Sequence, residues 1–480
     1  MPLATRAVLV VAALASVVLL AVAARYGWHR DELYFLEAGK HLALGYVDQP
    51  PFTPLLARLA DLIAPGNLFV LRLAPALATA ATVVFGALLA RELGGARRAQ
   101  LLAAGAVGGS GFVLGAGHLL ATATFDLMTW MAMLWLFTRL LRTAAPRWWV
   151  PWGVIAGLSL WNKDLVTLLV LIVGVTLLVT RRWRLLVNGW IAVGAALALA
   201  IALPQLLWQA THHWPQLEMA RVLSKRLAGE NRTLLVPSQL LLLSPVFVPL
   251  MVRGFRALWR SADFRPLAVA WPVGMVGAFV TAGRPYYVIP LTIVLVVAGV
   301  VATDRTRPEQ RLGRLVIVSA VLTTLVALPI IPISLLPSSH FADVNQAVAE
   351  TVGWPQLADQ VKGVVAGLPA DERAHVMILT GSYGEAGAID LFGPSRGLPH
   401  AFSPHNSYWY FRQPDDDRAT VVAVRMLPDE LAPFFRECGQ VGRVDNGLDV
   451  ANEVQGEPIV VCRGLLEPWA STWPRLKFLA

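Results

Sequence analysis

Long apolar runs separated by short basic loops are the feature that most limits what this chain can fold into. About eleven such runs precede residue 337, and most approach the ~20 residues that a helix needs to cross a bilayer. They lie near 7–24, 68–90, 99–117, 125–141, 151–162, 164–180, 185–208, 239–254, 267–283, 286–302 and 315–336. The sequence therefore predicts a polytopic α-helical membrane protein with about 11 transmembrane helices.

Five arginine-containing loops set the predicted orientation. They span 91–98, 142–147, 181–184, 253–265 and 305–314. Short cytoplasmic loops collect Lys and Arg, so all five are expected on the cytoplasmic side, with the C-terminus outside. One crossing over residues 150–180 would put Arg181 outside. We therefore expect two short helices meeting near Asn162-Lys163-Asp164, a break that is tolerated where it lines a protein cavity.

The composition excludes several classes of protein. Only 15% of the residues are charged and mean hydropathy is +0.58, whereas soluble domains average about 25% charged residues. The net charge of +9 comes largely from the basic loops. No nucleic-acid-binding motif accompanies this charge, so no nucleic-acid partner is expected. No phosphate-binding glycine loop is present, so no nucleotide cofactor is expected. The first run resembles a signal peptide, but its length and the later spans favour a retained helix.

Two domains are predicted, a transmembrane domain over 1–336 and an extracytoplasmic α/β domain over 337–480. The second is rich in charge, Gly and Pro, and its apolar runs at 376–379, 421–424 and 459–461 are typical of buried strands. Residues 380–385 predict a turn from a strand into a helix. Cys438 and Cys462 both lie in this domain, where a disulfide is expected, with two free buried thiols as the alternative.

Between the first two spans, residues 31–64 predict two helices outside the membrane core. Phe52, Leu55, Leu59 and Ile63 recur at helical spacing in a segment too short and too polar to span. Such a helix is expected to lie along the membrane surface, as is a similar helix over 33–44.

Four carboxylates fall on the predicted external side: Asp31, Glu32, Asp48 and Asp126. Converging carboxylates can act as a general base or bind a divalent cation. Each also has a structural alternative: Asp31 as a helix cap, Asp48 in a turn before two prolines, and Asp126 as a charge at a helix N-terminus. Because separate segments present carboxylates to the same side, we favour a shared site.

Cationic side chains occur on the same predicted side. Arg221 lies in the segment 209–238, Arg284 lies in a turn between two spans, and Lys163 lies at the predicted helix break. Guanidinium and ammonium groups suit phosphate oxygens. The alternatives are a local ion pair of Lys163 with Asp164, and snorkelling of Arg284 to the interface.

Several motifs in this sequence resemble one family. They are Arg30-Asp31-Glu32-Leu33-Tyr34, Gly45-Tyr46-Val47-Asp48-Gln49-Pro50-Pro51 and Gly283-Arg284-Pro285-Tyr286-Tyr287. These motifs resemble bacterial glycosyltransferase family 39 of the GT-C superfamily, which includes protein O-mannosyltransferases and the lipid A aminoarabinose transferase. The tail segments 383–388 and 405–409 resemble the exported domain of one bacterial branch.

The resemblance implies an inverting transfer of a sugar from a polyprenyl-phosphate carrier to an envelope acceptor, in the bacterial inner membrane and on its external face. It implies Asp31 as the general base. Glu32 is expected to support it, and Asp126 is expected to be a further catalytic carboxylate of the shared site. The residues expected to bind the donor phosphate are Arg221, Arg284, Lys163, Gln49, Tyr286 and Tyr287. A divalent metal ion would be held by Asp48 and Glu218.

Two positions depart from the family pattern, because Gln49 replaces a lysine and Met219 stands where a histidine is expected. Membrane lipids are the other expected partners. The alternatives are a transporter or lipid-carrier flippase, and a non-catalytic assembly factor.

Overall fold

The computed structural model describes residues 1–306 and 310–480, which form two compact units. Unit 1 comprises Met1–Ala23, Gln49–Phe52 and Arg72–Leu328, and unit 2 comprises Ala24–Asp48, Thr53–Leu71 and Pro329–Ala480. The unit that contains the C-terminal domain thus also includes most of the segment that precedes the second apolar run. The predicted domain boundary near residue 337 does not coincide with this division.

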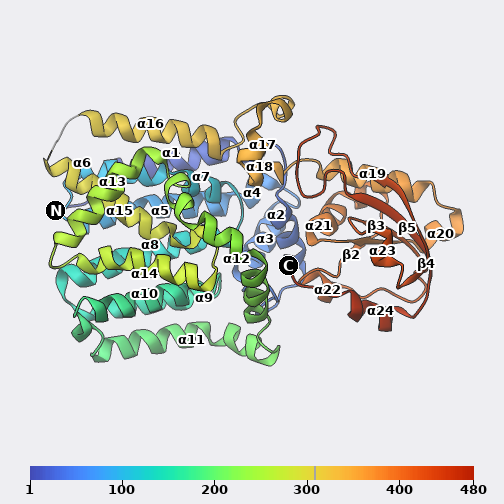
Figure 1. Cartoon of the computed structure of the whole chain (residues 1–480), viewed down its shortest axis with the longest axis horizontal. Coiled ribbons are helices and arrows are strands. Elements are labelled where there is room, and N and C mark those ends of the chain that lie inside the picture. The colour runs from blue at the N-terminus through green and yellow to red at the C-terminus, as the bar shows by residue number, and fades with distance from the viewer. Residues whose placement is uncertain (307–309) are drawn as a thin grey trace. The chain divides into compact units, whose positions relative to one another are not determined.

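Unit 1 consists of helices that follow the apolar runs (Figure 1). They are α1 (Thr5–Ala21), α5 (Leu73–Glu92), α6 (Arg97–Gly108), α7 (Gly111–His118), α8 (Thr122–Thr143), α9 (Trp149–Leu160), α10 (Val166–Val179), α11 (Gly189–Thr211), α12 (Pro215–Leu241), α13 (Val248–Arg260), α14 (Arg265–Thr281), α15 (Ile289–Thr306) and α16 (Gln310–Ala327), with the 3-10 turns η1 (Pro146–Trp148), η2 (Trp183–Leu185), η3 (Pro245–Phe247) and η4 (Pro285–Val288).

Glycines allow the closest approaches between these helices. A Cβ atom at Gly153 of α9 would lie 2.1 Å from the carbonyl oxygen of Gly194 in α11. At Gly254 of α13 it would lie 1.9 Å from the carbonyl oxygen of Leu295 in α15. Such close backbone approaches at glycines are typical of helices that associate within a membrane, where lipid offers no hydrophobic drive for helix pairing.

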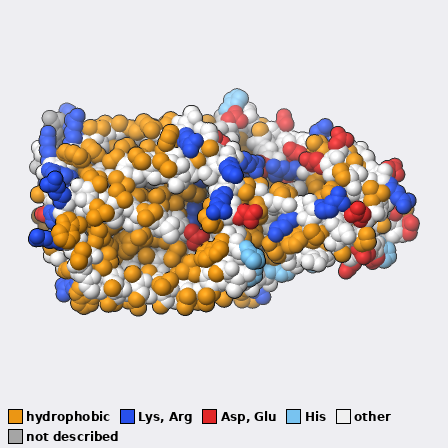
Figure 2. All heavy atoms as spheres, turned by 60° about the horizontal axis from the view of Figure 1, so that its bottom comes forward, with side chains coloured by type: hydrophobic (Ala, Val, Ile, Leu, Met, Phe, Trp, Pro, Cys, Tyr) orange, Lys and Arg blue, Asp and Glu red, His pale blue; other side chains and the backbone are white. Residues whose placement is uncertain are grey.

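The apolar helices indicate a multi-pass membrane protein. Within the described residues, Leu68–Glu92, Gly189–Thr211 and Pro285–Thr306 are long and apolar enough to cross a membrane, which gives 3 spans, or up to 5 with two bent pairs. Apolar side chains cover much of the face of unit 1 in Figure 2. The number of eleven spans stays a prediction.

Two predicted spans are not single helices. The run at 99–117 divides into α6 and α7, which meet at 56°. The run at 239–254 contains the end of α12 and the start of α13, which meet at 74°. In contrast, the predicted break near Asn162-Lys163-Asp164 is confirmed, because α9 ends at Leu160 and α10 begins at Val166.

The described parts of the five basic loops lie on one side of unit 1. Arg139 and Arg142 bind Glu92 at 3.1 and 2.6 Å. The loop after α15 joins the same group, because Arg305 donates to the carbonyl oxygen of Leu93 at 2.8 Å. The other loops are linked by two bonds: Trp149 Nε1 to the carbonyl oxygen of Leu185 at 2.8 Å, and Arg182 to Asp263 at 3.0 Å. Their common side is therefore confirmed, and its cytoplasmic location stays a prediction.

Unit 2 is an α/β fold around one mixed sheet, with the strand order β2-β1-β3-β5-β4. The strands β1 (Met377–Thr380), β2 (Ala401–Phe402) and β3 (Thr420–Val424) are parallel to one another. The strand β5 (Pro458–Leu465) pairs antiparallel with β3 on one side and with β4 (Phe435–Arg443) on the other. The helices are α2 (Arg30–Lys40), α3 (Phe52–Ile63), α4 (Leu68–Leu71), α17 (Phe341–Val344), α18 (Gln346–Ala349), α19 (Trp354–Ala366), α20 (Ala370–Ala374), α21 (Tyr383–Phe392), α22 (Tyr408–Phe411), α23 (Pro428–Leu431) and α24 (Trp469–Leu476), with the 3-10 turns η5 (Ile333–Leu335), η6 (Pro337–Ser339) and η7 (Pro394–Arg396).

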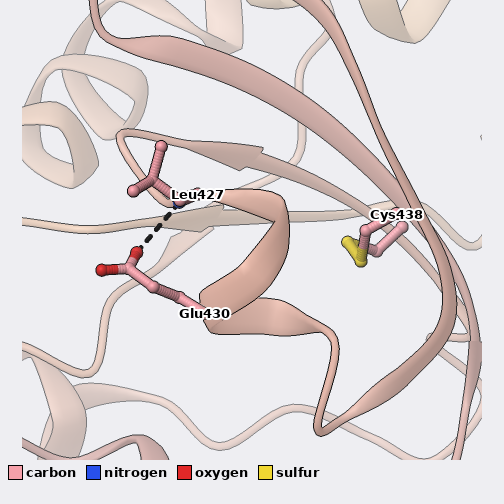
Figure 3. The surroundings of a disulfide bond; sticks show 4 residues. Leu427, Glu430 and Cys438 are labelled. Carbon is pink, nitrogen blue, oxygen red and sulfur yellow. Dashed lines mark hydrogen bonds between the residues drawn. A yellow bond between two sulfur atoms is a disulfide. The ribbon is translucent and has the colours of Figure 1, made fainter.

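The predicted strands are confirmed, and their alternation separates two faces of the sheet. Val460 and Cys462 of β5 belong to a core with Trp469 and Trp473 of α24. Ile459 and Val461 instead line a groove of 530 Å³ beside α19. Cys438 lies directly opposite Cys462 on the neighbouring strand, and the predicted disulfide is formed (Figure 3).

The helix α2 is covered by protein. Residues Glu32 to Gly39 are all buried, and α2 packs against α21, where a Cβ at Gly387 would lie 2.8 Å from the Cβ of Leu33. Unlike the surface helix that its sequence suggests, α2 is thus a core element of unit 2. This packing positions the acidic residues at its start.

Candidate functional site

The start of α2 separates the roles of its two acidic residues. Glu32 is fully buried, and its Oε2 accepts a hydrogen bond from the backbone N–H of His29 at 2.9 Å. His29 Nδ1 in turn accepts from the backbone N–H of Asp31 at 3.2 Å. This reciprocal arrangement satisfies free helix-end donors, so Glu32 and His29 cap the helix. Asp31 is not the cap, and its side chain remains 34% exposed.

The Asp31 carboxylate is held by a residue from the C-terminal part of the chain. The hydroxyl of Tyr383 donates to Asp31 Oδ1 at 2.9 Å. Tyr383 opens α21 directly after β1, and Ser382 caps that helix by accepting from the Gly384 N–H. Arg30 Nε lies 3.6 Å from Asp31 Oδ1, so a positive charge also faces the carboxylate.

Asp48 has its own donors. The hydroxyl of Tyr34 donates to Asp48 Oδ1 at 2.8 Å, and the hydroxyl of Ser407 lies 3.3 Å from the same oxygen. The Val47 N–H donates to Ser407 Oγ at 3.1 Å, which fixes the serine against the turn. Burial raises the pKa of Asp48 to about 6, against the opposing effect of the Tyr34 hydrogen bond, and Asp31 raises it further.

The two tyrosines join these carboxylates. The rings of Tyr34 and Tyr383 stack with centroids 4.6 Å apart and planes at 26°. Each ring carries a hydroxyl bonded to a different carboxylate, Asp48 and Asp31. The predicted convergence of these two acidic residues is therefore present within unit 2, through aromatic partners that our sequence analysis assigned no role.

Unit 1 contains a separate cationic and aromatic cluster. Lys163 Nζ lies 3.3 Å from the hydroxyl of Tyr286 and 4.8 Å from the ring centroid of Tyr287. Tyr286 and Tyr287 lie in η4, whereas Lys163 lies in the turn between α9 and α10. The predicted alternative for Lys163 was an ion pair with Asp164. The structure directs the ammonium group toward the tyrosines instead.

Asp126 and Gln49 adjoin this turn. Asn162 donates to the carbonyl oxygen of Thr122 at the start of α8, and Asp126 interacts electrostatically with Lys163. The segment 49–52 is tied to the same turn by a 2.9 Å bond from the Phe52 N–H to the Trp161 carbonyl oxygen. Asp126 Oδ1 and Gln49 Nε2 are buried and have no hydrogen-bond partner among the described residues. Both atoms are therefore available to a polar ligand.

The two predicted arginines lie on neighbouring segments of unit 1. Arg221 is exposed on α12, three residues before Ser224, whose hydroxyl donates to the carbonyl oxygen of Thr281 at 2.8 Å. Arg284 lies three residues after Thr281, in the turn leading to η4, and the Arg284 carbonyl oxygen accepts from the Tyr287 N–H at 3.0 Å. Glu218 is also exposed on α12. Figure 2 shows cationic and acidic side chains on the viewed surface among the apolar ones.

The two predicted metal ligands belong to different units, Asp48 to unit 2 and Glu218 to unit 1. Over residues 1–306 and 310–480, no group of three or more His, Cys, Asp or Glu side chains could hold a metal ion. Asp48 Oδ1 accepts a hydrogen bond from the Tyr34 hydroxyl, and the Ser407 hydroxyl lies 3.3 Å from the same oxygen. The divalent ion therefore stays a prediction.

Three site residues were given no role by our sequence reasoning: Tyr34, Tyr383 and Ser407. All three fall within the family-like motifs, so the resemblance was the signal that could have found them. Periodicity could not, because Tyr34 looks like a core residue of a helix. The pairing of Tyr383 with Asp31 depends on a contact across 352 positions.

Comparison with known proteins supports the resemblance. Residues 48–208, about a third of the chain, match the model of the dolichyl-phosphate-mannose-protein mannosyltransferase family. No curated protein sequence gives a significant match to the chain.

The fold is similar to that of ArnT from Cupriavidus metallidurans bound to undecaprenyl phosphate, with a TM-score of 0.62 and 19% identity over 95% of this chain and 98% of that one. The arabinofuranosyltransferase AftD from Mycobacteria gives a TM-score of 0.52 and 15% identity over 97% of this chain and 40% of AftD. The predicted resemblance is thus supported by sequence over residues 48–208, which match the mannosyltransferase family, and by a fold similar to ArnT over nearly the whole chain.

Proposed function

We propose that this protein is an inverting glycosyltransferase that moves a sugar from a polyprenyl-phosphate carrier to a hydroxyl group of an envelope acceptor. The observation that carries this proposal is the environment of the Asp31 side chain. Its carboxylate is partly exposed, is not used as a helix cap, and is held by the Tyr383 hydroxyl. A general base must come within hydrogen-bond distance of the proton that it removes, and the partly exposed carboxylate of Asp31 can be reached by an acceptor hydroxyl.

The proposed reaction is a single displacement. The acceptor oxygen attacks the anomeric carbon of the donor sugar, and Asp31 takes the proton of the acceptor hydroxyl. The bond between the anomeric carbon and the phosphate oxygen breaks, and its electron pair leaves with the polyprenyl phosphate. Attack opposite the leaving group inverts the anomeric centre. General-base catalysis of this kind contributes roughly 100- to 10,000-fold.

For unit 1 we propose binding of the donor phosphate. Lys163 supplies a positive charge beside the hydroxyls of Tyr286 and Tyr287. Gln49 lies in the segment that is bonded to the same turn, and its Nε2 is an unused donor. Arg221 and Arg284 are further candidate ligands. Charged donors fixed in place stabilise the negative charge that develops on the leaving phosphate. The solved ArnT structure with undecaprenyl phosphate supports a carrier of this chemistry.

The proposed location is the bacterial inner membrane, with the chemistry and the C-terminal domain on the external side. The basic loops on one side of unit 1 support this orientation, because such loops remain in the cytoplasm. The exposed apolar helices suit both the membrane lipids and the hydrocarbon chain of the carrier.

The test is transfer by the purified full-length protein with native membranes from a deletion strain as the acceptor source. The donor probes are undecaprenyl-phosphate mannose and undecaprenyl-phosphate arabinofuranose, and the release of undecaprenyl phosphate is measured. We expect D31N to lower the rate at least about 100-fold. The matched control is D429N, an exposed aspartate on α23. Wild-type rates in D31N, or no release from either probe by wild type, would contradict the proposal.

One observation favours a second candidate, a flippase for the lipid carrier. The helix pairs α6–α7 and α12–α13 are sharply bent, and broken helices are frequent in transporters. A flippase would move a fluorescent polyprenyl phosphate across the vesicle bilayer without consuming a sugar donor. It would also retain that activity in D31N.

A further inference from the structure

The C-terminal part of the chain places two side chains at one edge of its sheet. Tyr383 follows β1 and Ser407 follows β2, and these two strands are parallel neighbours (Figure 1). The carboxyl ends of parallel strands lie at the same edge, which is where α/β folds position ligand-binding and reactive groups. Ser407 contacts Asp48, and Tyr383 contacts Asp31.

Tyr383 is itself held in place. Its ring stacks on His405 at 4.8 Å, and His405 stacks on Phe478 at 4.7 Å. Burial lowers the pKa of His405 to about 4, so the imidazole is neutral at neutral pH and serves as a packing partner. Tyr383 also stacks on Tyr34. Stacked aromatic rings fix their mutual orientation, so the Tyr383 hydroxyl has a defined position.

We propose that Tyr383 is a positioning residue for the glycosyl transfer, which makes the C-terminal domain part of the catalytic machinery. This inference rests on the proposed function, because it assigns Tyr383 to the Asp31 base. The hydroxyl orients the carboxylate and stabilises its charged form, and the ring pair sets Asp31 relative to Asp48. The base therefore depends on two segments far apart in the sequence.

Several charged or titratable groups face Asp31. His29 Nδ1 lies 3.8 Å from its carboxylate and Arg30 Nε lies 3.6 Å away, both on its own helix end. Tyr383 faces it from α21, and Asp48 interacts with it electrostatically. Tyr383 belongs to α21 and is hydrogen-bonded directly to Asp31. Its hydroxyl can therefore be removed while His29 and Arg30, which lie at the start of α2, are left in place.

The chain offers a matched control. Tyr408 is buried in the same unit, and its hydroxyl donates to Asp390 at 2.7 Å. Y408F therefore removes a buried tyrosine–carboxylate hydrogen bond of the same kind without touching Asp31. Y383F and Y408F each preserve the ring and remove one oxygen. A merely structural role for Tyr383 would give the two variants the same behaviour.

The first measurement is the pH profile of kcat/KM, with whichever undecaprenyl-phosphate sugar the wild type accepts and membranes of the deletion strain. A lost donor destabilises the charged carboxylate, so in Y383F the acidic limb moves to higher pH by about one unit and activity on that limb falls about tenfold. Y408F keeps the wild-type limb. Thermal unfolding of both variants checks that they are folded.

The second measurement needs no sugar. A water-soluble carbodiimide with an amine modifies protonated carboxyl groups, and peptide mass spectrometry quantifies the product at Asp31. At a pH about two units above the acidic limb, where only a small fraction of Asp31 is protonated, Y383F should be modified about tenfold faster than wild type and Y408F at the wild-type rate.

The two measurements separate the possible failures. Equal labelling and equal pH profiles in Y383F, Y408F and wild type would overturn the role of Tyr383. Full activity of D31N would instead overturn Asp31 as the base, and with it the proposed function, even where labelling shows that Tyr383 controls the carboxylate. A fall in kcat/KM in Y383F without movement of the limb would also contradict the inference.

Discussion

The hydroxyl of Tyr383 donates a 2.9 Å hydrogen bond to Asp31, which lies 352 positions earlier in the chain. A family-like motif near the N-terminus is therefore completed by a residue of the C-terminal α/β fold. The parallel contact of Ser407 with Asp48 repeats this arrangement on the second carboxylate. Both contacts lie within unit 2, so this compact unit contains the proposed base together with the groups that hold it.

Replacing Ser407 by alanine should weaken the turn that carries Asp48. The variant loses the hydroxyl near the carboxylate and the acceptor for the Val47 N–H. A buried N–H left without an acceptor costs about 1–3 kcal/mol, so the unfolding free energy should fall by that amount. Urea unfolding of the full-length protein in detergent measures it. S395A, which removes an exposed hydroxyl on η7, should unfold like the wild type.

The raised pKa of Asp48 predicts a pH-dependent stability. Its carboxyl has an ordinary pKa of 3.8 and a folded value of about 6, because burial penalises the charge. Between these values the folded state binds more protons than the unfolded state, so stability falls as pH rises from about 4 to about 6. Unfolding midpoints of D48N and wild type across this window should diverge, with D48N gaining relative stability toward pH 6. A constant difference would contradict the prediction.

Replacing Lys163 by methionine should weaken binding of the carrier phosphate. The ammonium group beside Tyr286 is the charged donor of that cluster, and charge-assisted bonds to phosphate are the stronger class. We expect about a tenfold increase in the Kd for undecaprenyl phosphate, measured by titration of the detergent-solubilised protein. K225M, which removes an exposed lysine on α12, provides the control for lost net charge. Equal affinity of K163M and K225M would remove Lys163 from the phosphate site.

Removal of the disulfide should destabilise unit 2 selectively. Cys438 and Cys462 close a loop with a sequence separation of 24. A cross-link over a loop of this length stabilises by about 3 kcal/mol in the chain-entropy model. C438S/C462S should therefore lower the unfolding temperature of the α/β fold. Near-ultraviolet circular dichroism of the tryptophans around the disulfide measures this unfolding. The wild type in reductant should unfold at the same lowered temperature as the variant. An unchanged unfolding temperature in both samples would exclude a stabilising disulfide.

Local sequence patterns, together with the rule that basic loops stay on one side, predicted much of the secondary structure. The break near Asn162 followed from the need to keep the basic loops on one side, and the strands at 376–379 and 421–424 followed from short apolar runs. The bends after Gly108 and Leu241 were missed because hydropathy alone does not distinguish a straight apolar helix from a bent one. The burial of α2 was missed for a similar reason: its polar residues include Glu32 and Glu37, which are buried with partners.

The sequence by itself indicated that the chain belongs in a membrane, where its apolar segments and several of its strands lie, and which carboxylates could carry chemistry, because these properties depend on composition and spacing along the chain. Only the tertiary structure decided that Glu32 caps its helix while Asp31 is held by Tyr383, and that Asp48 is bonded by Tyr34 and Ser407. These roles depend on side chains that meet after distant segments pack together, and spacing in the sequence does not encode the direction from which a partner arrives.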